Sequence, residues 1–128
     1  MNDQRCVLIV DPSEETREVL QTALERRGLR TLAAGRGPQG LELARRHHPD
    51  LIVLDAEMES AGRADLAGPL AAESAACGGR MVLLGSGRAA PSGVSRGEFV
   101  AKPYHYAALI RRIEELLAAA PHAAAATC

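Results

Sequence analysis

Short runs of apolar residues recur along the chain, and each is continuous rather than alternating with polar positions. Four such runs lie at residues 6–10, 51–54, 81–84 and 99–101. Continuous apolar runs are typical of parallel strands that are covered by helices on both faces of a sheet. A weaker run at residues 30–34 indicates an edge strand. The pattern therefore predicts five strands.

Segments with a helical repeat of apolar residues separate most of these runs. They cover residues 14–27, 37–47, 65–76 and 106–119, and the last is the clearest amphipathic helix. Gly28 follows the first segment, in the place where a glycine commonly ends a helix. The stretch Asp11-Pro12-Ser13-Glu14 before it predicts a helix start with Pro12 as the first helical residue and Glu14 as the third.

The order of elements is β-α-β-α-β-α-β-loop-β-α, which predicts an α/β fold with right-handed crossovers. The simplest arrangement is a flavodoxin-like, doubly wound sheet of five parallel strands in the order 2-1-3-4-5. Residues 86–97 are rich in Gly, Pro and Ser, so we expect an irregular loop in place of the fourth helix. We also expect one domain over residues 1–120 and an Ala-rich flexible tail over residues 121–128.

The composition narrows the classes of function. A chain of 128 residues suits one domain, and a net charge of −1 offers no basic field for nucleic acid or an anionic membrane. Phe99, Tyr104 and Tyr106 are the only Phe, Tyr or Trp residues, which argues against carbohydrate sites and single-strand nucleic-acid platforms. The three cysteines lack paired spacing, and no membrane span or secretory segment is evident, so the sequence indicates a protein of the reducing cytosol.

Polar side chains follow four of the predicted strands at the carboxyl edge of the sheet, where open parallel sheets bind ligands. Asp11 ends the first strand, Asp55 the third and Lys102 the fifth, and Ser86 follows the fourth. The first and third strands are neighbours in the expected order, so Asp11 and Asp55 should face each other. One carboxylate can act as a nucleophile and another can help hold a divalent cation, while the hydroxyl and the ammonium bind phosphoryl oxygens. The set predicts a site that handles a phosphoryl group.

With these residues, the sequence resembles the receiver domain of two-component response regulators over residues 5–119. The resemblance is carried by Val10-Asp11, by Pro49-Asp50-Leu51-Ile52-Val53-Leu54-Asp55 and by Lys102-Pro103-Tyr104. It implies that Asp55 accepts a phosphoryl group, that Lys102 senses the phosphate, and that Ser86 and Phe99 act as switch residues. Lys102 is also the only lysine beside fourteen arginines, which suits a site that needs a compact point charge.

The resemblance further implies a Mg²⁺ site formed by Asp11, Asp55 and the backbone carbonyl of Glu57. The carboxylate of Glu57 could partly replace a lost acid, or it could be a solvated loop residue that adds negative potential. The implied partners are a histidine kinase or phosphotransfer protein and a downstream signalling protein, with no direct contact to nucleic acid or membrane. The implied chemistry is at most the autocatalytic phosphorylation and dephosphorylation of Asp55, so the domain is not expected to be an enzyme.

Two positions depart from the family pattern, and a third is ambiguous. Receivers usually carry a second acid after the first strand that ligates the Mg²⁺, and this chain has Pro12, so we expect weak or absent Mg²⁺ binding. Glu59 stands where the family usually has proline. The switch hydroxyl position falls on Gly85 if the fourth strand ends at Leu84, and on Ser86 after a shift of one residue. The resemblance of this turn to Ala-Thr-Gly turns of the family favours Ser86.

Two hypotheses for the site follow. In the first, Asp55 accepts a phosphoryl group at a rate limited by poor Mg²⁺ affinity. In the second, the domain is a pseudo-receiver that docks partners without phosphorylation, and the lost ligand at Pro12 favours it. A hypothesis of another class is a small flavodoxin-like module that binds a nucleotide or another ligand through the 86–97 loop. Without a regular fourth helix, we expect a monomer or a weak dimer that does not use that helix face.

Overall fold

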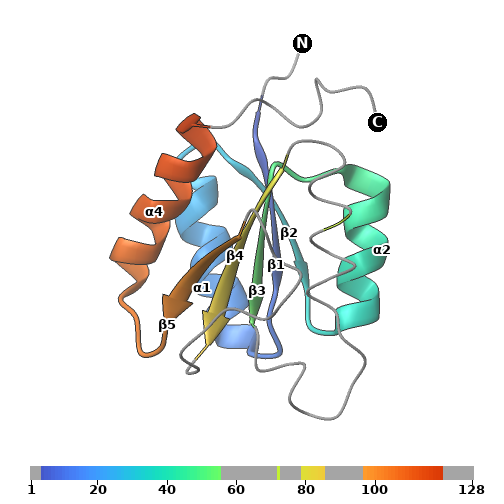
Figure 1. Cartoon of the computed structure of the whole chain (residues 1–128), viewed down its shortest axis with the longest axis horizontal. Coiled ribbons are helices and arrows are strands. Elements are labelled where there is room, and N and C mark those ends of the chain that lie inside the picture. The colour runs from blue at the N-terminus through green and yellow to red at the C-terminus, as the bar shows by residue number, and fades with distance from the viewer. Residues whose placement is uncertain (1–3, 56–71, 73–78, 86–96, 120–128) are drawn as a thin grey trace.

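Five parallel strands form one sheet in the order β2-β1-β3-β4-β5 in the computed structural model, which describes residues 4–55, 72, 79–85 and 97–119 (Figure 1). The strands are β1 (Cys6–Val10), β2 (Arg30–Ala34), β3 (Leu51–Asp55), β4 (Arg80–Gly85) and β5 (Gly97–Ala101). This order confirms the predicted flavodoxin-like arrangement, and the weak run of β2 forms an edge strand. Val10 of β1 lies opposite Leu54 of β3, so the next residues on the two chain segments, Asp11 and Asp55, are neighbours.

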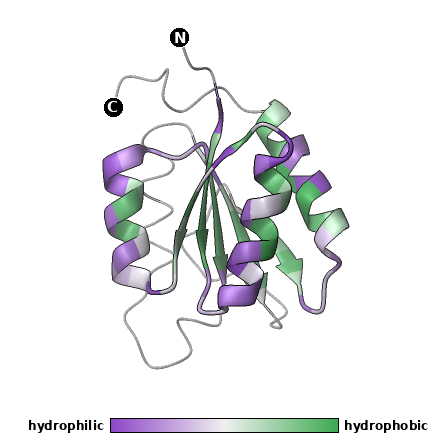
Figure 2. Cartoon of the chain, turned by 180° about the vertical axis from the view of Figure 1, so that it is seen from behind, coloured by the Kyte–Doolittle hydropathy of each residue, from purple (hydrophilic) through white to green (hydrophobic). Residues whose placement is uncertain are grey.

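Helices cover both faces of the sheet. One face carries α1 (Glu14–Glu25) and α4 (Tyr106–Ala119), and the opposite face carries α2 (Gly37–His47) (Figure 1). Figure 2 shows that the central strands are apolar along their length, whereas the helices alternate between apolar and polar surface. This is the layered arrangement that places ligand sites at the carboxyl edge of a parallel sheet.

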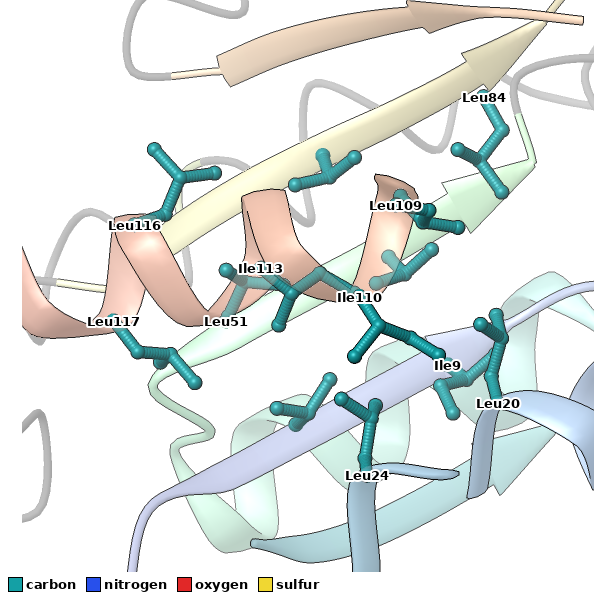
Figure 3. Packing of buried hydrophobic residues seen from close by; sticks show 13 residues of the cluster. Ile9, Leu20, Leu24, Leu51, Leu84, Leu109, Ile110, Ile113, Leu116 and Leu117 are labelled. Atoms are coloured by element: carbon teal, nitrogen blue, oxygen red, sulfur yellow. The ribbon is translucent and has the colours of Figure 1, made fainter. Parts of the chain in front are cut away.

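The continuous apolar runs follow from burial on both faces of the central strands. Successive strand residues point to opposite faces, so Ile9 belongs to the cluster with Leu20 and Ile113 under α1 and α4 (Figure 3). The preceding residue, Leu8, belongs to the second cluster, with Ala44 of α2. Each position of β1 is therefore buried, and none of the five is free to be polar.

α2 approaches β1 closely because Gly40 has no side chain. A Cβ atom at Gly40 would lie 2.7 Å from Cγ2 and 3.1 Å from Cγ1 of Val10. Carbon atoms do not pack at 2.7 Å, so any larger residue at position 40 would push the helix away from the strand. The glycine thus fixes the separation between α2 and the strand that ends next to Asp11.

The start of α1 lies two residues later than the sequence pattern predicted. The hydroxyl of Ser13 accepts a hydrogen bond from the N–H of Thr16 at 3.2 Å, which makes Ser13 the cap, and the helix begins at Glu14. The prediction of Pro12 as the first helical residue was wrong, because the carboxylate of Asp11 is engaged in a turn ahead of the helix and leaves the capping position to the serine.

Both α1 and α2 are followed by a residue in the left-handed conformation. Gly28 follows α1 with a φ of 84°, as the sequence predicted, and the N–H of Leu29 donates back to the carbonyl of Leu24 at 3.2 Å. His48 follows α2 with a φ of 49°, directly before Pro49. The adjacent residues His47 and His48 therefore lie at the end of α2, directly before the proline.

Asp50 is a buried carboxylate at the amino edge of the sheet, although a residue directly after a proline commonly lies in an exposed turn. Its side chain is 1% exposed and accepts a hydrogen bond from the N–H of Cys6 at 2.7 Å. Its own N–H donates to the carbonyl of Cys6 at 2.8 Å, and its carbonyl accepts from the N–H of Arg80 at 3.0 Å. Asp50 therefore ties together the starts of β1, β3 and β4.

Several predicted features lie outside the described residues: the helix at residues 65–76 apart from residue 72, the irregular loop after β4 and the tail at residues 121–128. Glu57, Glu59 and Ser86 lie outside them as well. Within the ranges that the structure describes, no helix has the length and apolar character needed to cross a membrane.

Candidate functional site

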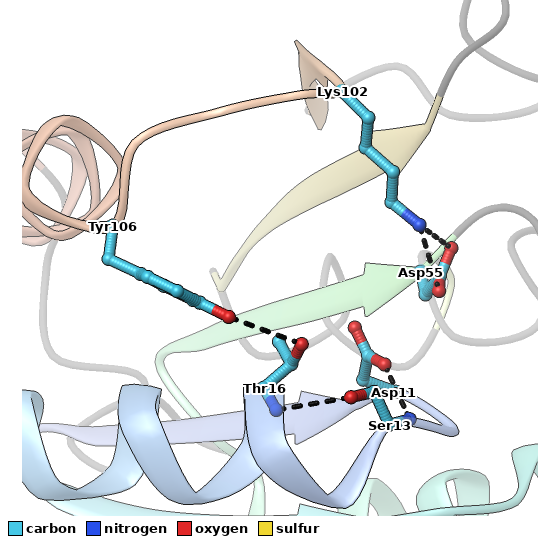
Figure 4. A network of polar contacts seen from close by, with 6 residues as sticks. All are labelled: Asp11, Ser13, Thr16, Asp55, Lys102 and Tyr106. Carbon is cyan, nitrogen blue, oxygen red and sulfur yellow. Dashed lines mark hydrogen bonds and ion pairs between the residues drawn. The ribbon is translucent and has the colours of Figure 1, made fainter.

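Two residues from distant strands meet at the carboxyl edge of the sheet. Asp55 is the last residue of β3, and Lys102 directly follows β5. The Nζ atom of Lys102 donates to both carboxylate oxygens of Asp55, at 3.1 Å to each (Figure 4). The backbone N–H of Lys102 donates to the carbonyl of Gly85 at 2.9 Å, which continues the pairing of β4 with β5 and fixes the start of the lysine side chain. The Asp55 side chain is 7% exposed, so its carboxylate is largely withdrawn from water.

A second carboxylate, Asp11, lies beside this pair. It is 3% exposed, and one of its oxygens accepts a hydrogen bond from the N–H of Ser13 at 2.8 Å across Pro12. Figure 4 shows Asp11 below Asp55, with its other oxygen pointing away from Ser13. Burial raises the pKa of the Asp11 carboxyl above its ordinary value, and the negative charge of Asp55 adds to that rise. The hydrogen bond from Ser13 and the positive charges of Lys102 and Arg17 oppose it.

These groups line a pocket of about 550 Å³ between the start of α1 and the segment that joins β5 to α4. Its wall on the α1 side comes from residues 11–13 and Thr16, and its floor includes Asp55. Its opposite wall comes from residues 102–104 and Tyr106. Lys102, Asp55 and Asp11 therefore belong to one concave site that opens beyond the strand ends, as predicted.

The aromatic wall of the pocket is held from two sides. The hydroxyl groups of Tyr106 and Thr16 lie 3.4 Å apart, which joins α4 to the first turn of α1 (Figure 4). The rings of Tyr104 and Tyr106 meet edge to face, with centroids 5.7 Å apart and planes at 90°. Burial raises the pKa of Tyr104 from 10.0 to about 12. The wall thus presents neutral rings next to the charged groups.

The structure brings together three of the site residues that the sequence singled out: Asp11, Asp55 and Lys102. Phe99 packs against the apolar cluster on the α2 face and does not line the pocket, and its role as a switch stays a prediction. β4 extends to Gly85, which is the register in which Ser86 is the first residue after the strand. The role of Ser86 also stays a prediction.

Sequence reasoning missed the two residues that join the walls of the pocket, Thr16 and Tyr106. Their spacing of 90 positions carries no pattern, and their contact arises only because α1 and α4 pack on the same face of the sheet. The one usable signal was the position of Tyr106, which falls within a few residues of the lysine at the end of the last strand.

Comparison with known proteins gives the chain relatives in one family. A family model described as the response regulator receiver domain matches residues 7–78. The chain is 33% identical over 129 residues to the transcriptional regulatory protein CseB of Streptomyces coelicolor, covering 96% of this chain and 53% of that protein. It is 35% identical over 54 residues to the polar-differentiation response regulator DivK of Brucella ovis, covering 42% of this chain and 44% of that protein. The chain spans about half the length of the curated relatives it matches.

Solved structures with the same architecture are similar over almost the whole chain. A response regulator receiver protein from Sinorhizobium medicae superimposes with a TM-score of 0.74 at 20% identity, covering 91% of this chain and 96% of that one. The chemotaxis protein CheY4 of Vibrio cholerae superimposes with a TM-score of 0.70 at 18% identity, covering 88% of this chain and 98% of that one. At these identities the likeness demonstrates a common fold.

Proposed function

The chain belongs to the response regulator receiver domain family, and from this premise we propose that it is a receiver that docks a signalling partner without being phosphorylated. The observation that carries the proposal is Pro12, which lines the pocket next to Asp11 in the position where the family commonly places a metal-ligating acid. A proline side chain has no oxygen with which to bind a cation. The domain as a whole is a module of two-component signalling.

The donor groups of the pocket support this view. Receiver domains typically bind Mg²⁺, which demands near-octahedral oxygen coordination. One oxygen of Asp11 is engaged by the N–H of Ser13, and both oxygens of Asp55 are engaged by Lys102. Within the part of the chain that the structure describes, no three His, Cys, Asp or Glu side chains gather as a metal site. These residues do not fit a dedicated Mg²⁺ centre.

The charge arrangement supports the same conclusion. For Asp55 to attack a phosphoryl donor, two anions must approach each other, and a divalent cation is the usual means of offsetting their repulsion. Lys102 offers a single positive charge, and it is already held between the two oxygens of Asp55. With its one lysine charge already bound to Asp55, the site favours a stable ion pair over phosphoryl transfer. A signal would then pass through contacts with a partner protein.

Response regulators interact with histidine kinases and with downstream effectors. For this chain, we infer that the docked partner is a protein of that signalling system and that it contacts the carboxyl edge of the sheet. The two walls of the pocket come from α1 and from the segment before α4, so a partner seated there would touch both. This edge also carries the clustered charges of Asp11, Asp55 and Lys102, which a partner could recognise.

The test is incubation with a small-molecule phosphodonor and Mg²⁺, followed by measurement of the intact mass. The expected result is no adduct on the wild-type chain. The variant Pro12→Asp restores an acid beside Asp11 and should gain one adduct of about 80 Da, the mass of a phosphoryl group. The double variant Pro12→Asp with Asp55→Asn is the matched control and should lose it.

A second candidate function is slow phosphorylation of Asp55, and the observation that favours it is the direct contact between Asp55 and Lys102 that the family resemblance implies. The same measurement decides between the two. A stoichiometric adduct on the wild-type chain that disappears in Asp55→Asn overturns docking without phosphorylation and establishes Asp55 as a working acceptor.

A further inference from the structure

The charges that line the pocket do not balance. Among the lining residues that the structure describes, Asp11 and Asp55 contribute two negative charges and Lys102 one positive charge, which leaves a net charge of −1. Lys102 is held by Asp55, and no ion pair joins Asp11 to a cation within the described ranges of the chain. The guanidinium of Arg17 packs against Gly35, where a Cβ would lie 3.2 Å from its Nη2 atom, and Arg17 does not line the pocket.

Asp11 is therefore a buried carboxylate with one oxygen available to a ligand. The residue is 3% exposed, and the one hydrogen bond that it accepts from a described residue, from the N–H of Ser13, uses one oxygen. The second oxygen points away from Ser13 (Figure 4), and Asp11 lines the pocket. A buried carboxylate gains from a cation that reaches it, because little water remains to solvate its charge. The net charge of −1 suits a cation with a single charge.

The walls of the pocket select the shape of that cation. Tyr104 and Tyr106 present rings that are fixed by their contact with each other and, for Tyr106, by the hydroxyl of Thr16. Aromatic faces attract cations, and a flat guanidinium can stack on a ring while its N–H groups bind a carboxylate. Pro12 and Pro103 add apolar surface against which an aliphatic stem can lie. A wall that is already ordered costs little entropy when a ligand binds.

We propose that this pocket receives the guanidinium group of an arginine side chain from the docking partner, bound by the free oxygen of Asp11 and stacked against the tyrosine wall. The proposal rests on the proposed function, because it names the group by which a partner engages the unphosphorylated site. A lysine ammonium would carry the same charge but cannot stack in the same way.

The test uses a probe that carries only the arginine side chain, N-acetyl-arginine amide, titrated into the full chain while backbone amide NMR shifts are followed. We expect saturable shifts of amides around the pocket. N-acetyl-citrulline amide has nearly the same shape without the charge and should bind about tenfold more weakly or worse. N-acetyl-lysine amide should also bind more weakly. These comparisons use the wild-type chain, so they do not depend on the folding of a variant.

Variants then assign the carboxylate. Asp11→Asn keeps an oxygen that can accept from Ser13 but removes the charge, so it should weaken the arginine probe about tenfold. Glu18→Gln removes a charge from an exposed position of the same helix and should leave binding unchanged. The proposal would be overturned if the citrulline or lysine probe bound as tightly as the arginine probe. It would also be overturned if Asp11→Asn and Glu18→Gln lost the same affinity, or if no amide shift occurred at the pocket.

This result is independent of the phosphorylation test, because the titration contains no phosphodonor. A wild-type chain that gains the mass adduct yet binds the arginine probe would refute docking without phosphorylation and leave the guanidinium site standing. A chain that gains no adduct and binds no probe would refute the guanidinium site alone.

Discussion

Lys102 is joined to Asp55 by two hydrogen bonds of 3.1 Å, across 47 positions of the sequence and between the ends of two strands that are not adjacent in the sheet. The pair is unequal in its surroundings, since the aspartate side chain is 7% exposed and the lysine side chain 27%. Water therefore reaches the lysine but hardly reaches the aspartate. Removing the lysine should cost more than removing a typical surface charge, because it leaves a buried carboxylate beside Asp11.

This relationship is measurable as a coupling energy. In a double-mutant cycle of Lys102→Met and Asp55→Asn, followed by urea unfolding, we expect a favourable coupling of about 1–2 kcal/mol, reduced from the value of a fully buried pair by the exposure of the lysine. The single Lys102→Met variant should be the less stable of the two single variants.

The exposed pair of Arg46 and Glu42 provides the control cycle. Its atoms lie 2.9 Å apart, but its side chains are 66% and 62% exposed. A pair of this kind within one helix contributes about 0.3–0.5 kcal/mol. If the coupling of Lys102 with Asp55 does not exceed that of the control, the pair is solvated in solution and does not stabilise the carboxyl edge of the sheet.

The packing of α2 on β1 gives a second prediction. Gly40→Ala should destabilise the fold by about 1–3 kcal/mol, because its new methyl group would meet the side chain of Val10. The usual gain in helix propensity from glycine to alanine, about 1 kcal/mol, opposes this and is included in the range. Gln39→Ala, at an exposed position of the same helix, should change stability by less than about 0.5 kcal/mol. The measurement is the free energy of unfolding of the two variants. An equal loss in both would mean that α2 moves to accommodate the new methyl group at little cost.

The third prediction concerns pH. Burial raises the pKa of the Cys6 thiol from 9.0 to about 11, with Arg30 opposing the rise and Asp50 adding to it. The folded chain therefore retains a proton that the unfolded chain releases, so the stabilisation is complete below pH 9.0 and is lost as the pH rises through about 11. The slope is at most about 1.4 kcal/mol per pH unit.

Cys6→Ala isolates this effect, because alanine does not titrate while every other group is retained. The variant should be less stable than the wild type at neutral pH, and the difference should shrink as the pH rises above 9.0. Denaturant unfolding at a series of pH values gives the difference. A gap between the two proteins that stays constant up to pH 11 would show that the thiol titrates as it does in the unfolded chain.

The sequence predicts the sheet well because burial on both faces leaves a strong record. β1 is apolar at all five positions and its bounds were predicted without error, whereas β2, at the edge, left a weaker pattern. Strand order then placed Asp11 and Asp55 side by side, and the single lysine of the chain pointed to the third member of the site. Each of these inferences depends on one-dimensional spacing or on residue type.

Features that depend on tertiary contacts could not be predicted from the sequence. Asp50 follows a proline and has the composition of a turn, yet its carboxylate is buried because the N–H of Cys6 in another strand needs an acceptor. The start of α1 was misplaced because Asp11 and Ser13 are both good capping residues, and only the turn across Pro12 decides between them. Local propensity could not rank two caps that lie two residues apart.

Pro12 offers the most direct test of how the site handles metal. Anything that binds the folded chain and not the unfolded chain raises its stability by mass action. With millimolar Mg²⁺, the thermal midpoint of the wild-type chain should match that in NaCl of equal ionic strength, since the pocket lacks a third ligand among the described side chains. Pro12→Asp should bring three carboxylates together, and its midpoint should be lower than that of the wild type without Mg²⁺ because of their mutual repulsion. Added Mg²⁺ should then raise it by several degrees. A wild-type chain that gains as much from Mg²⁺ as Pro12→Asp does would show that oxygens outside the described residues complete the metal site.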